Sequence, residues 1–185
     1  MNIPALKKET TCCFSGYRPH KFPFEFTKSN EDYTRLESDI LNAVLKSYQE
    51  GYRDFLCGGA MGFDLLCGEI TLLLKLRFPE IRLACILPFE GQAESFPKSW
   101  KDRYHAVLSA CDCIDYIAEE YTPRCYFVRN ERMVDCSSRV ITYFDGKSGG
   151  TARTIAYAQR SKLEIINLCQ TNSLPEHLTF FTGRK

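Results

Sequence analysis

The sequence alternates short apolar runs with longer segments of helical period, and this alternation constrains the fold more than any other feature. Six runs rich in apolar, β-branched or cysteine residues lie at about 11–16, 53–57, 81–87, 113–118, 138–144 and 163–168. Segments with helical spacing separate them, at about 29–51, 63–77, 97–110, 123–135 and 151–161. Strands that alternate with helices form parallel sheets with right-handed crossovers. We therefore predict an α/β fold: a Rossmann-like, doubly wound and mostly parallel sheet of about six strands, with helices on both faces.

The chain has 185 residues, which suits one domain with a sizeable core. No linker or break in composition divides it. We predict a single domain over residues 1–185, with its core at about 11–168 and a weakly structured tail at 171–185.

The first helical segment carries apolar residues at fourfold spacing, from Leu36 through Ile40 and Val44. Ser29 and Asp32 have the spacing of a capping box at its start, and Gly51 marks its end.

Composition narrows the function classes. No stretch approaches the about 20 apolar residues that span a bilayer, and the N-terminus lacks the apolar core of a signal peptide. We therefore expect a cytoplasmic protein without membrane contact. The formal net charge is +1, and no basic stripe is evident, so nucleic acid is not the expected partner. A homodimer is left open, because no apolar surplus decides the oligomeric state.

The ten cysteines do not indicate a disulfide framework, because nothing points to secretion. Cys13, Cys57, Cys85 and Cys169 lie in strand-like runs, which predicts small reduced core residues. Cys111 and Cys113 form the C-x-C pair, and no second pair stands at ligand spacing, so we predict no metal site.

Glycine-rich or polar loops follow four of the predicted strands. In open parallel sheets the ligand crevice lies at the carboxyl ends of the strands. Glycines that open a helix expose backbone N–H groups to an anion, and the helix dipole favours negative charge there. The loops at the ends of strands 2 and 5 both have this form, which predicts one shared crevice. The candidate ligand-binding residues in these loops are Ser15, Gly16, Arg18, Gly58, Gly59, Gly62, Asp64, Glu90, Gly149, Gly150 and Thr151.

Two further candidates, Arg129 and Asn130, lie on the helix before the fifth strand. Asp64 opens the second helix, where it serves either as a helix N-terminal charge or as a partner for ribose hydroxyls. Neither G-x-G-x-x-G after the first strand nor a P-loop motif is present, so no dinucleotide or P-loop chemistry is predicted.

Five segments in order resemble the SLOG superfamily, and within it the YpsA-like group of bacterial proteins. They are "CCFSGYRP", "CGGAMGFD", "LPFEGQ", "RNERMVD" and "GGTARTIAYA". The resemblance extends over about residues 11–168. The chain departs from the group at Tyr17, where histidine is usual. The resemblance implies a pocket for a nucleotide or nucleotide-derived ligand, with a sensor or effector role and no required cofactor.

Two other functions follow from relatives in the same superfamily. The LONELY GUY phosphoribohydrolases cleave the N-glycosidic bond of nucleoside monophosphates, and a carboxylate near the ribose is needed for such chemistry. Thr154 stands where their glutamate belongs, so no catalytic residue is predicted and recognition is favoured over catalysis. DNA-processing protein A offers single-stranded DNA binding, for which aromatic residues such as Tyr17, Phe22, Phe24 and Phe26 would provide stacking.

Overall fold

The computed structural model describes residues 6–170, so the tail predicted at 171–185 lies outside the described residues. The strands are β1 (Thr11–Ser15), β2 (Asp54–Cys57), β3 (Arg82–Phe89), β4 (Cys113–Ala118), β5 (Arg139–Thr142) and β6 (Glu164–Asn167). The helices are α1 (Glu31–Gln49), α2 (Phe63–Arg77), α3 (Lys98–Ala110), α4 (Cys125–Asp135) and α5 (Gly150–Arg160). Short 3-10 turns occur at Lys8–Thr10 (η1), Pro19–Lys21 (η2) and Leu168–Gln170 (η3).

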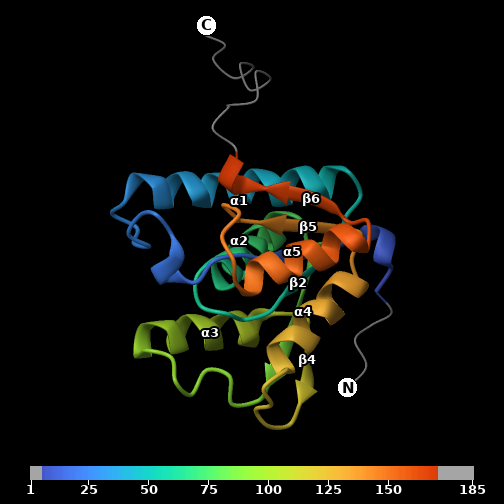
Figure 1. The fold of residues 1–185 in the computed structure, drawn as a ribbon. Helices are drawn as coiled ribbons and strands as arrows, with labels where there is room; N and C mark the ends of the chain where they lie inside the picture. Colours follow the sequence, from blue (N-terminus) through green and yellow to red (C-terminus); the bar gives the residue numbers. More distant parts are fainter. Residues whose placement is uncertain (1–5, 171–185) are drawn as a thin grey trace, which may run out of the picture.

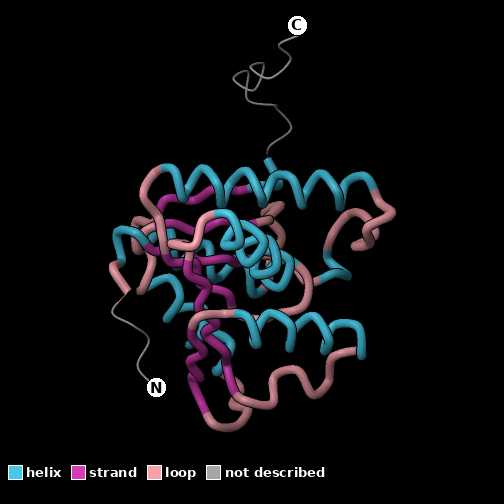
Figure 2. Tube along the Cα trace, turned by 180° about the vertical axis from the view of Figure 1, so that it is seen from behind, coloured by secondary structure: helices cyan, strands magenta, loops and turns pink. Residues whose placement is uncertain are grey.

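The strands form one parallel sheet in the order β4-β3-β2-β1-β5-β6. The predicted α/β, Rossmann-like fold is therefore confirmed. Helices α4 and α5 cover one face of the sheet and α1 to α3 the other (Figures 1 and 2). Strand β1 is buried on both sides, with Cys12 and Phe14 in the α1–α3 core and Cys13 in the α4–α5 core. Such two-sided burial explains why the strands read as continuous apolar runs rather than as alternating ones.

Helix α1 starts one residue later than the capping box suggested. Asn30, not Ser29, is the N-cap, because its Oδ1 accepts hydrogen bonds from the backbone N–H groups of Asp32 (2.9 Å) and Tyr33 (3.3 Å). Either residue type can cap a helix, so the sequence could not choose between neighbours. Gly51, just after the helix, has φ of 100°, as the predicted stop requires.

The cysteines depart from prediction at one position. Cys13, Cys57 and Cys85 are buried in strands, and all ten thiols are unbridged. Cys169 lies in η3 and is partly exposed, because β6 already ends at Asn167. The prediction of a strand at that residue was wrong.

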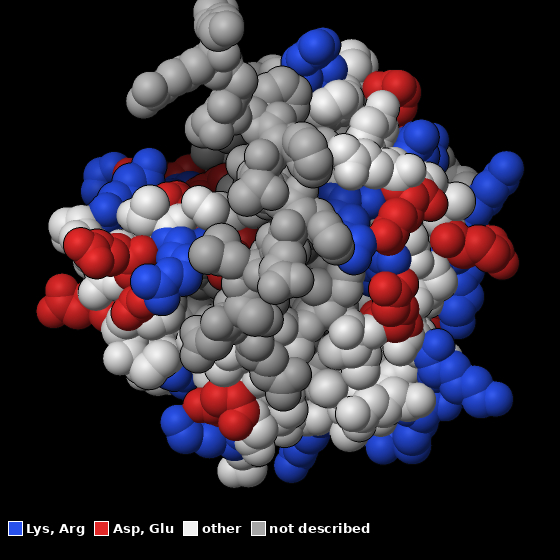
Figure 3. All heavy atoms as spheres, turned by 90° about the horizontal axis from the view of Figure 1, so that it is seen from above, with Lys and Arg blue, Asp and Glu red and all other residues white. Residues whose placement is uncertain are grey.

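The switch in strand order lies between β1 and β5, where Ser15 pairs in register with Thr142. At such a point the connections leave to opposite sides, and a crevice opens between them. No helix among residues 6–170 is long and apolar enough to cross a bilayer. On the face seen in Figure 3, basic and acidic side chains are interspersed among the described residues, as the near-neutral formal charge indicates.

Candidate functional site

The loop after β1 holds the other strand-end loops together. The carbonyl of Tyr17 accepts a hydrogen bond from the backbone N–H of Phe63, at the start of α2 (3.0 Å). The Tyr17 hydroxyl donates to the Asp145 carboxylate in the loop after β5, and the Thr151 hydroxyl donates to the Gly16 carbonyl (3.1 Å). The loops after β1, β2 and β5 thus meet at one edge of the sheet. Their predicted role in ligand binding stays a prediction.

The aromatic residues of the first loop pack on one another, and two of them are buried. Phe22 lies at the centre, with ring centroids 4.7 Å from Phe26, 4.8 Å from Tyr143 and 5.1 Å from Phe24. Tyr17 and Phe22 are only 4% and 8% exposed. These two rings are therefore core residues of the loop, and they are not available for base stacking.

The glycines after β2 accommodate the protein's own atoms. A Cβ on Gly58 would lie 1.4 Å from Nη1 of Arg129 and 2.8 Å from Oδ2 of Asp64. A Cβ on Gly62, whose φ is 93°, would lie 2.5 Å from the Tyr17 carbonyl oxygen. Close packing within the protein thus accounts for these two glycines without a ligand.

Gly59 is also closely packed against other residues of the protein. Its φ is 67°, and an added Cβ would meet Leu87 at 2.8 Å and the ring of Tyr104 at 3.0 Å. The three glycines are all buried. The sequence suggested that they leave room for phosphate or sugar, whereas the described atoms already occupy the space in front of each.

Asp64 and Arg129 form a buried ion pair beneath this turn. Nη1 of Arg129 lies 3.4 Å from Oδ2 of Asp64, and the two side chains are 5% and 8% exposed. Burial raises the pKa of Asp64, while the charges of Arg129 and Arg18 and hydrogen bonds from the backbone of Ala60 and Gly58 lower it. Asp64 is thus held inside the protein in the first turn of α2, with Arg129 as its counter-charge.

Two buried polar residues here were missed by sequence reasoning. Nε2 of Gln92 donates to the carbonyls of Gly58 (3.3 Å) and Gly59 (2.9 Å). Oε1 of Gln92, the hydroxyl of Tyr104 and Nε of Arg129 are buried and have no hydrogen-bond partner among residues 6–170. Gln92 stands in the quoted "LPFEGQ" segment, whose residue types gave no sign that the amide rather than Glu90 faces the turn.

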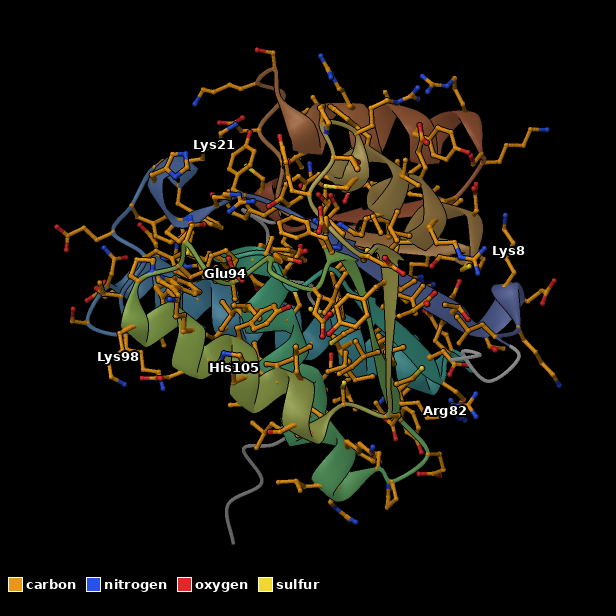
Figure 4. All side chains as sticks on the ribbon, turned by 90° about the horizontal axis from the view of Figure 1, so that it is seen from below. Lys8, Lys21, Arg82, Glu94, Lys98 and His105 are labelled. Carbon is orange, nitrogen blue, oxygen red and sulfur yellow. The ribbon has the colours of Figure 1, made fainter. Side chains whose placement is uncertain are left out.

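Glu90 lies apart from the other predicted residues. It lines a cavity of about 600 Å³ beyond β3 and β4, together with Glu94, His105 and Tyr121. Glu94 and His105 are labelled in Figure 4, on the loop after β3 and on α3. None of the other predicted ligand residues lines this cavity.

The N-terminus of α5 is open, unlike the turn after β2. Gly149 is the N-cap with φ of 147°, and a Cβ on Gly150 would meet nothing within 4 Å. A cavity of about 620 Å³ is lined here by Ser148, Gly149, Gly150 and Arg153, among others. The first turn contains no acidic residue, and the Lys21 amino group, labelled in Figure 4, lies 2.9 Å from the position of a Cβ on Gly149. The predicted anion-binding geometry is therefore accessible at this loop.

Asn130 and Arg18 flank the same edge from other elements. Nδ2 of Asn130 donates to the Thr154 hydroxyl (2.8 Å), which in turn donates to the Gly150 carbonyl (3.1 Å). Arg18 is half-buried, lies 6.0 Å from the ring centroid of Tyr126 on α4, and makes no ion pair with any residue in 6–170. Asn130 thus positions the first turn of α5, while Arg18 keeps its guanidinium donors available.

Comparison with protein families places this geometry in context. A family model described as the YspA SLOG family (YpsA) matches residues 12–169. A UPF0398 protein of Halalkalibacterium halodurans is 27% identical over 139 residues, covering 74% of this chain and 73% of that protein. A UPF0398 protein of Bacillus anthracis is 25% identical over 158 residues, covering 83% of this chain and 84% of that protein.

Two solved structures share the fold at low sequence identity. DNA processing protein A of Streptococcus pneumoniae superposes with a TM-score of 0.55 at 13% identity, over 85% of this chain. The chain spans only 50% of that protein. The Helicobacter pylori protein, described for its single-stranded DNA binding mode, gives a TM-score of 0.58 at 15% identity. The match covers 93% of this chain and 68% of that protein. Likeness at this level of identity establishes the architecture alone.

Proposed function

Since the chain belongs to the YspA SLOG family, we propose that it binds a nucleotide or nucleotide-derived small molecule at the carboxyl ends of its strands. The observation that carries the proposal is the open N-terminus of α5 at the switch in strand order. The open space at Gly150, a first turn without carboxylates and the nearby Lys21 together suit a phosphate at this helix N-terminus.

The proposed site is centred on α5 rather than on the turn after β2. Gly16 and Thr151 tie the first loop to α5, and Arg18 supplies an unpaired guanidinium from that loop. Arginine binds phosphate through a planar fork of donors. The buried pair of Asp64 and Arg129 then supports the edge from within, rather than contacting the ligand.

Recognition is favoured over hydrolysis by the residues around α5. Thr154, at the position where the phosphoribohydrolase motif carries glutamate, is 5% exposed and hydrogen-bonded to Asn130 and Gly150. Asp145 is the carboxylate beside the loop, and hydrogen bonds from Lys147 and Tyr17 lower its pKa to about 2. An acid held ionised in this way is unsuited to protonate a leaving base near neutral pH.

The proposal is tested by thermal shift with adenosine monophosphate, ADP-ribose, cyclic nucleotides and inorganic phosphate. A ligand that binds only the folded state stabilises it by about 2.7 kcal/mol at a hundredfold excess over Kd. Gly150→Val fills the open space, and Arg18→Ala removes the guanidinium, so both should abolish the shift. Arg77→Ala, an exposed arginine on α2, is the matched control. The absence of a shift with all four compounds, or an unchanged shift in Gly150→Val, would refute the proposed site.

Catalysis is tested separately, by incubating the protein with adenosine monophosphate and following free adenine by chromatography. We expect no release above the buffer blank. Adenine released by the wild type and not by Gly150→Val would assign a hydrolase to the same site.

Single-stranded DNA binding is the second candidate function. It is favoured by the structural likeness to the H. pylori protein, whose description names that activity. A gel shift at low salt tests it, because electrostatic binding of nucleic acid is strongest there. No retardation of a labelled oligonucleotide at low salt would remove this candidate.

A further inference from the structure

A groove runs along the outer face of α4 and α5, continuous with the open N-terminus of α5. It has a volume of about 430 Å³ and is lined by residues of both helices, including Arg124, Phe127, Glu131, Arg153, Tyr157 and Arg160. We call it the arginine groove. Arg153 and Ala156 line both this groove and the cavity at Gly149 and Gly150. Figure 1 shows the two helices side by side in front of the sheet.

The charge of the groove is not neutralised by the protein. Arg124, Arg153 and Arg160 are exposed, and none of them forms an ion pair with a carboxylate in the described part of the chain. Glu131 is the acidic residue that lines the groove, and no ion pair joins it to these arginines. Three cations therefore face solvent around a hollow with one carboxylate in its lining, and a second carboxylate, Asp135, is hydrogen-bonded to the lining residue Tyr157.

The placement of Arg124 is not explained by helix stability. Arg124 is the N-cap of α4, and the first turn of that helix contains no acidic residue. A cation at a helix N-terminus opposes the helix dipole, whereas Arg160 in the last turn of α5 complements it. The unfavourable position of Arg124 is consistent with a bound anion that offsets it.

Two of the guanidinium groups lie over aromatic rings. Cζ of Arg153 lies 4.9 Å from the ring centroid of Phe127, and Cζ of Arg160 lies 5.6 Å from that of Tyr157. The Tyr157 hydroxyl donates to Asp135 (2.9 Å), which fixes one edge of its ring. Arginines that bind phosphates, next to rings that stack bases, are the combination found in single-strand binding surfaces.

The groove and the cavity at the N-terminus of α5 together extend over more than one nucleotide. From Gly150, which lines the cavity, to Arg160, which lines the groove, α5 rises by about 15 Å at 1.5 Å per residue. We propose that the arginine groove binds a single-stranded nucleic acid segment that continues from the phosphate site at the N-terminus of α5. The inference rests on the proposed function in taking that N-terminus as the start of the path, and it gives the second candidate function a defined surface.

Fluorescence anisotropy with labelled ten-nucleotide oligo-dT and oligo-rU tests the inference over a range of salt concentrations. The variant Arg124→Gln/Arg160→Gln removes two groove charges. Its control, Lys46→Gln/Arg77→Gln, removes two exposed charges from α1 and α2 on the other face of the sheet. We expect the groove variant to bind about tenfold or more weakly, and its slope of log K against log salt to shrink by about 1.4. The control should retain the wild-type slope, and the tighter of the two oligomers shows which kind of strand the groove prefers.

Phe127→Leu tests the stacking component, and we expect it to weaken oligonucleotide binding by about fivefold or more without changing the salt slope. Binding of neither oligomer, or equal affinity and slope in the groove variant and the control, would overturn the inference. Melting temperatures measured for every variant exclude loss of fold as the cause.

Failure of the inference is distinguishable from failure of the proposed function. The thermal shift with adenosine monophosphate should persist in Arg124→Gln/Arg160→Gln, whereas Gly150→Val should lose it. A nucleotide shift without oligonucleotide binding refutes the groove alone. Oligonucleotide binding that depends on the groove, without a nucleotide shift, refutes the small-molecule proposal alone.

Discussion

Gly58→Ala should destabilise the protein far more than the addition of one methyl group suggests. The new Cβ would lie 1.4 Å from Nη1 and 2.4 Å from Cζ of Arg129, so the guanidinium must move. It is the end of a flexible side chain, but it is enclosed and paired with Asp64 at 3.4 Å. Moving it leaves the Asp64 carboxylate buried without its counter-charge.

Separating a buried ion pair costs about 3–5 kcal/mol. For a domain of this size, that corresponds to a fall in melting temperature of about 6–20 °C. Urea denaturation and calorimetry of Gly58→Ala measure both quantities. Gly150→Ala is the control, because its Cβ meets nothing within 4 Å and alanine is favoured over glycine in a helix by about 1 kcal/mol.

The pH dependence separates a lost ion pair from a simple steric clash. Burial already raises the pKa of Asp64, and Arg129 opposes that rise. With the guanidinium displaced, the Asp64 pKa of the folded variant rises further, so the folded variant binds a proton at a higher pH than the wild type. The loss of unfolding free energy in Gly58→Ala should be full near pH 7. It should shrink as the pH falls toward about 3.9, the pKa of an aspartate in the unfolded chain.

A double-mutant cycle tests whether displacement of Arg129 causes the loss of stability in Gly58→Ala. Arg129→Met removes the guanidinium, so Gly58→Ala added to that background should cost much less than in the wild type. If Gly58→Ala melts within about 2 °C of the wild type, or if its cost is the same with and without Arg129, the packing explanation of this glycine is wrong.

Three further outcomes are expected. Asn30→Ala should destabilise the fold by about 1 kcal/mol in urea, while Ser29→Ala should change it little; the reverse order would reassign the cap of α1. Thr151→Val should cost about 1 kcal/mol through loss of its hydrogen bond to the first loop, and an unchanged unfolding midpoint would count against that bond. Lys147→Met should raise the Asp145 pKa from about 2 toward 3.8 in an NMR titration. Because that pKa is depressed in the folded state, its contribution to stability is present above about pH 4 and lost toward pH 2. The free energy of unfolding of the variant should therefore fall less steeply over this pH range.

Periodicity predicted the order of strands and helices because each element carries its own pattern. Two-sided burial made the strands apolar throughout, and helical spacing marked α1 before any contact was known. Boundaries were less certain where neighbouring residues have similar chemistry. Asparagine and serine side chains can both cap a helix N-terminus, and only the backbone geometry selects Asn30 over Ser29.

The candidate site was predictable in part. Strand ends in a parallel sheet share an edge, so the meeting of the loops after β1, β2 and β5 followed from the fold. The sequence could not show which atoms fill the space in front of each glycine, because Arg129 reaches Gly58 from a distant part of the sequence. Gln92 was missed for a similar reason: only tertiary contacts reveal that its amide binds the carbonyls of the turn.

The strand order also governs how the protein can form during synthesis. Strand β1 pairs with β5, and that partner leaves the ribosome only after β2, β3 and β4 have been made. Pairing between segments so distant in sequence closes a long loop and slows folding. The first four strands can assemble early, but β1 keeps one open edge until Thr142 has emerged, and exposed edges invite aggregation. The crevice at the switch point therefore cannot form in a nascent chain until β5 has been made, and only the pairing of β6 with β5 comes later.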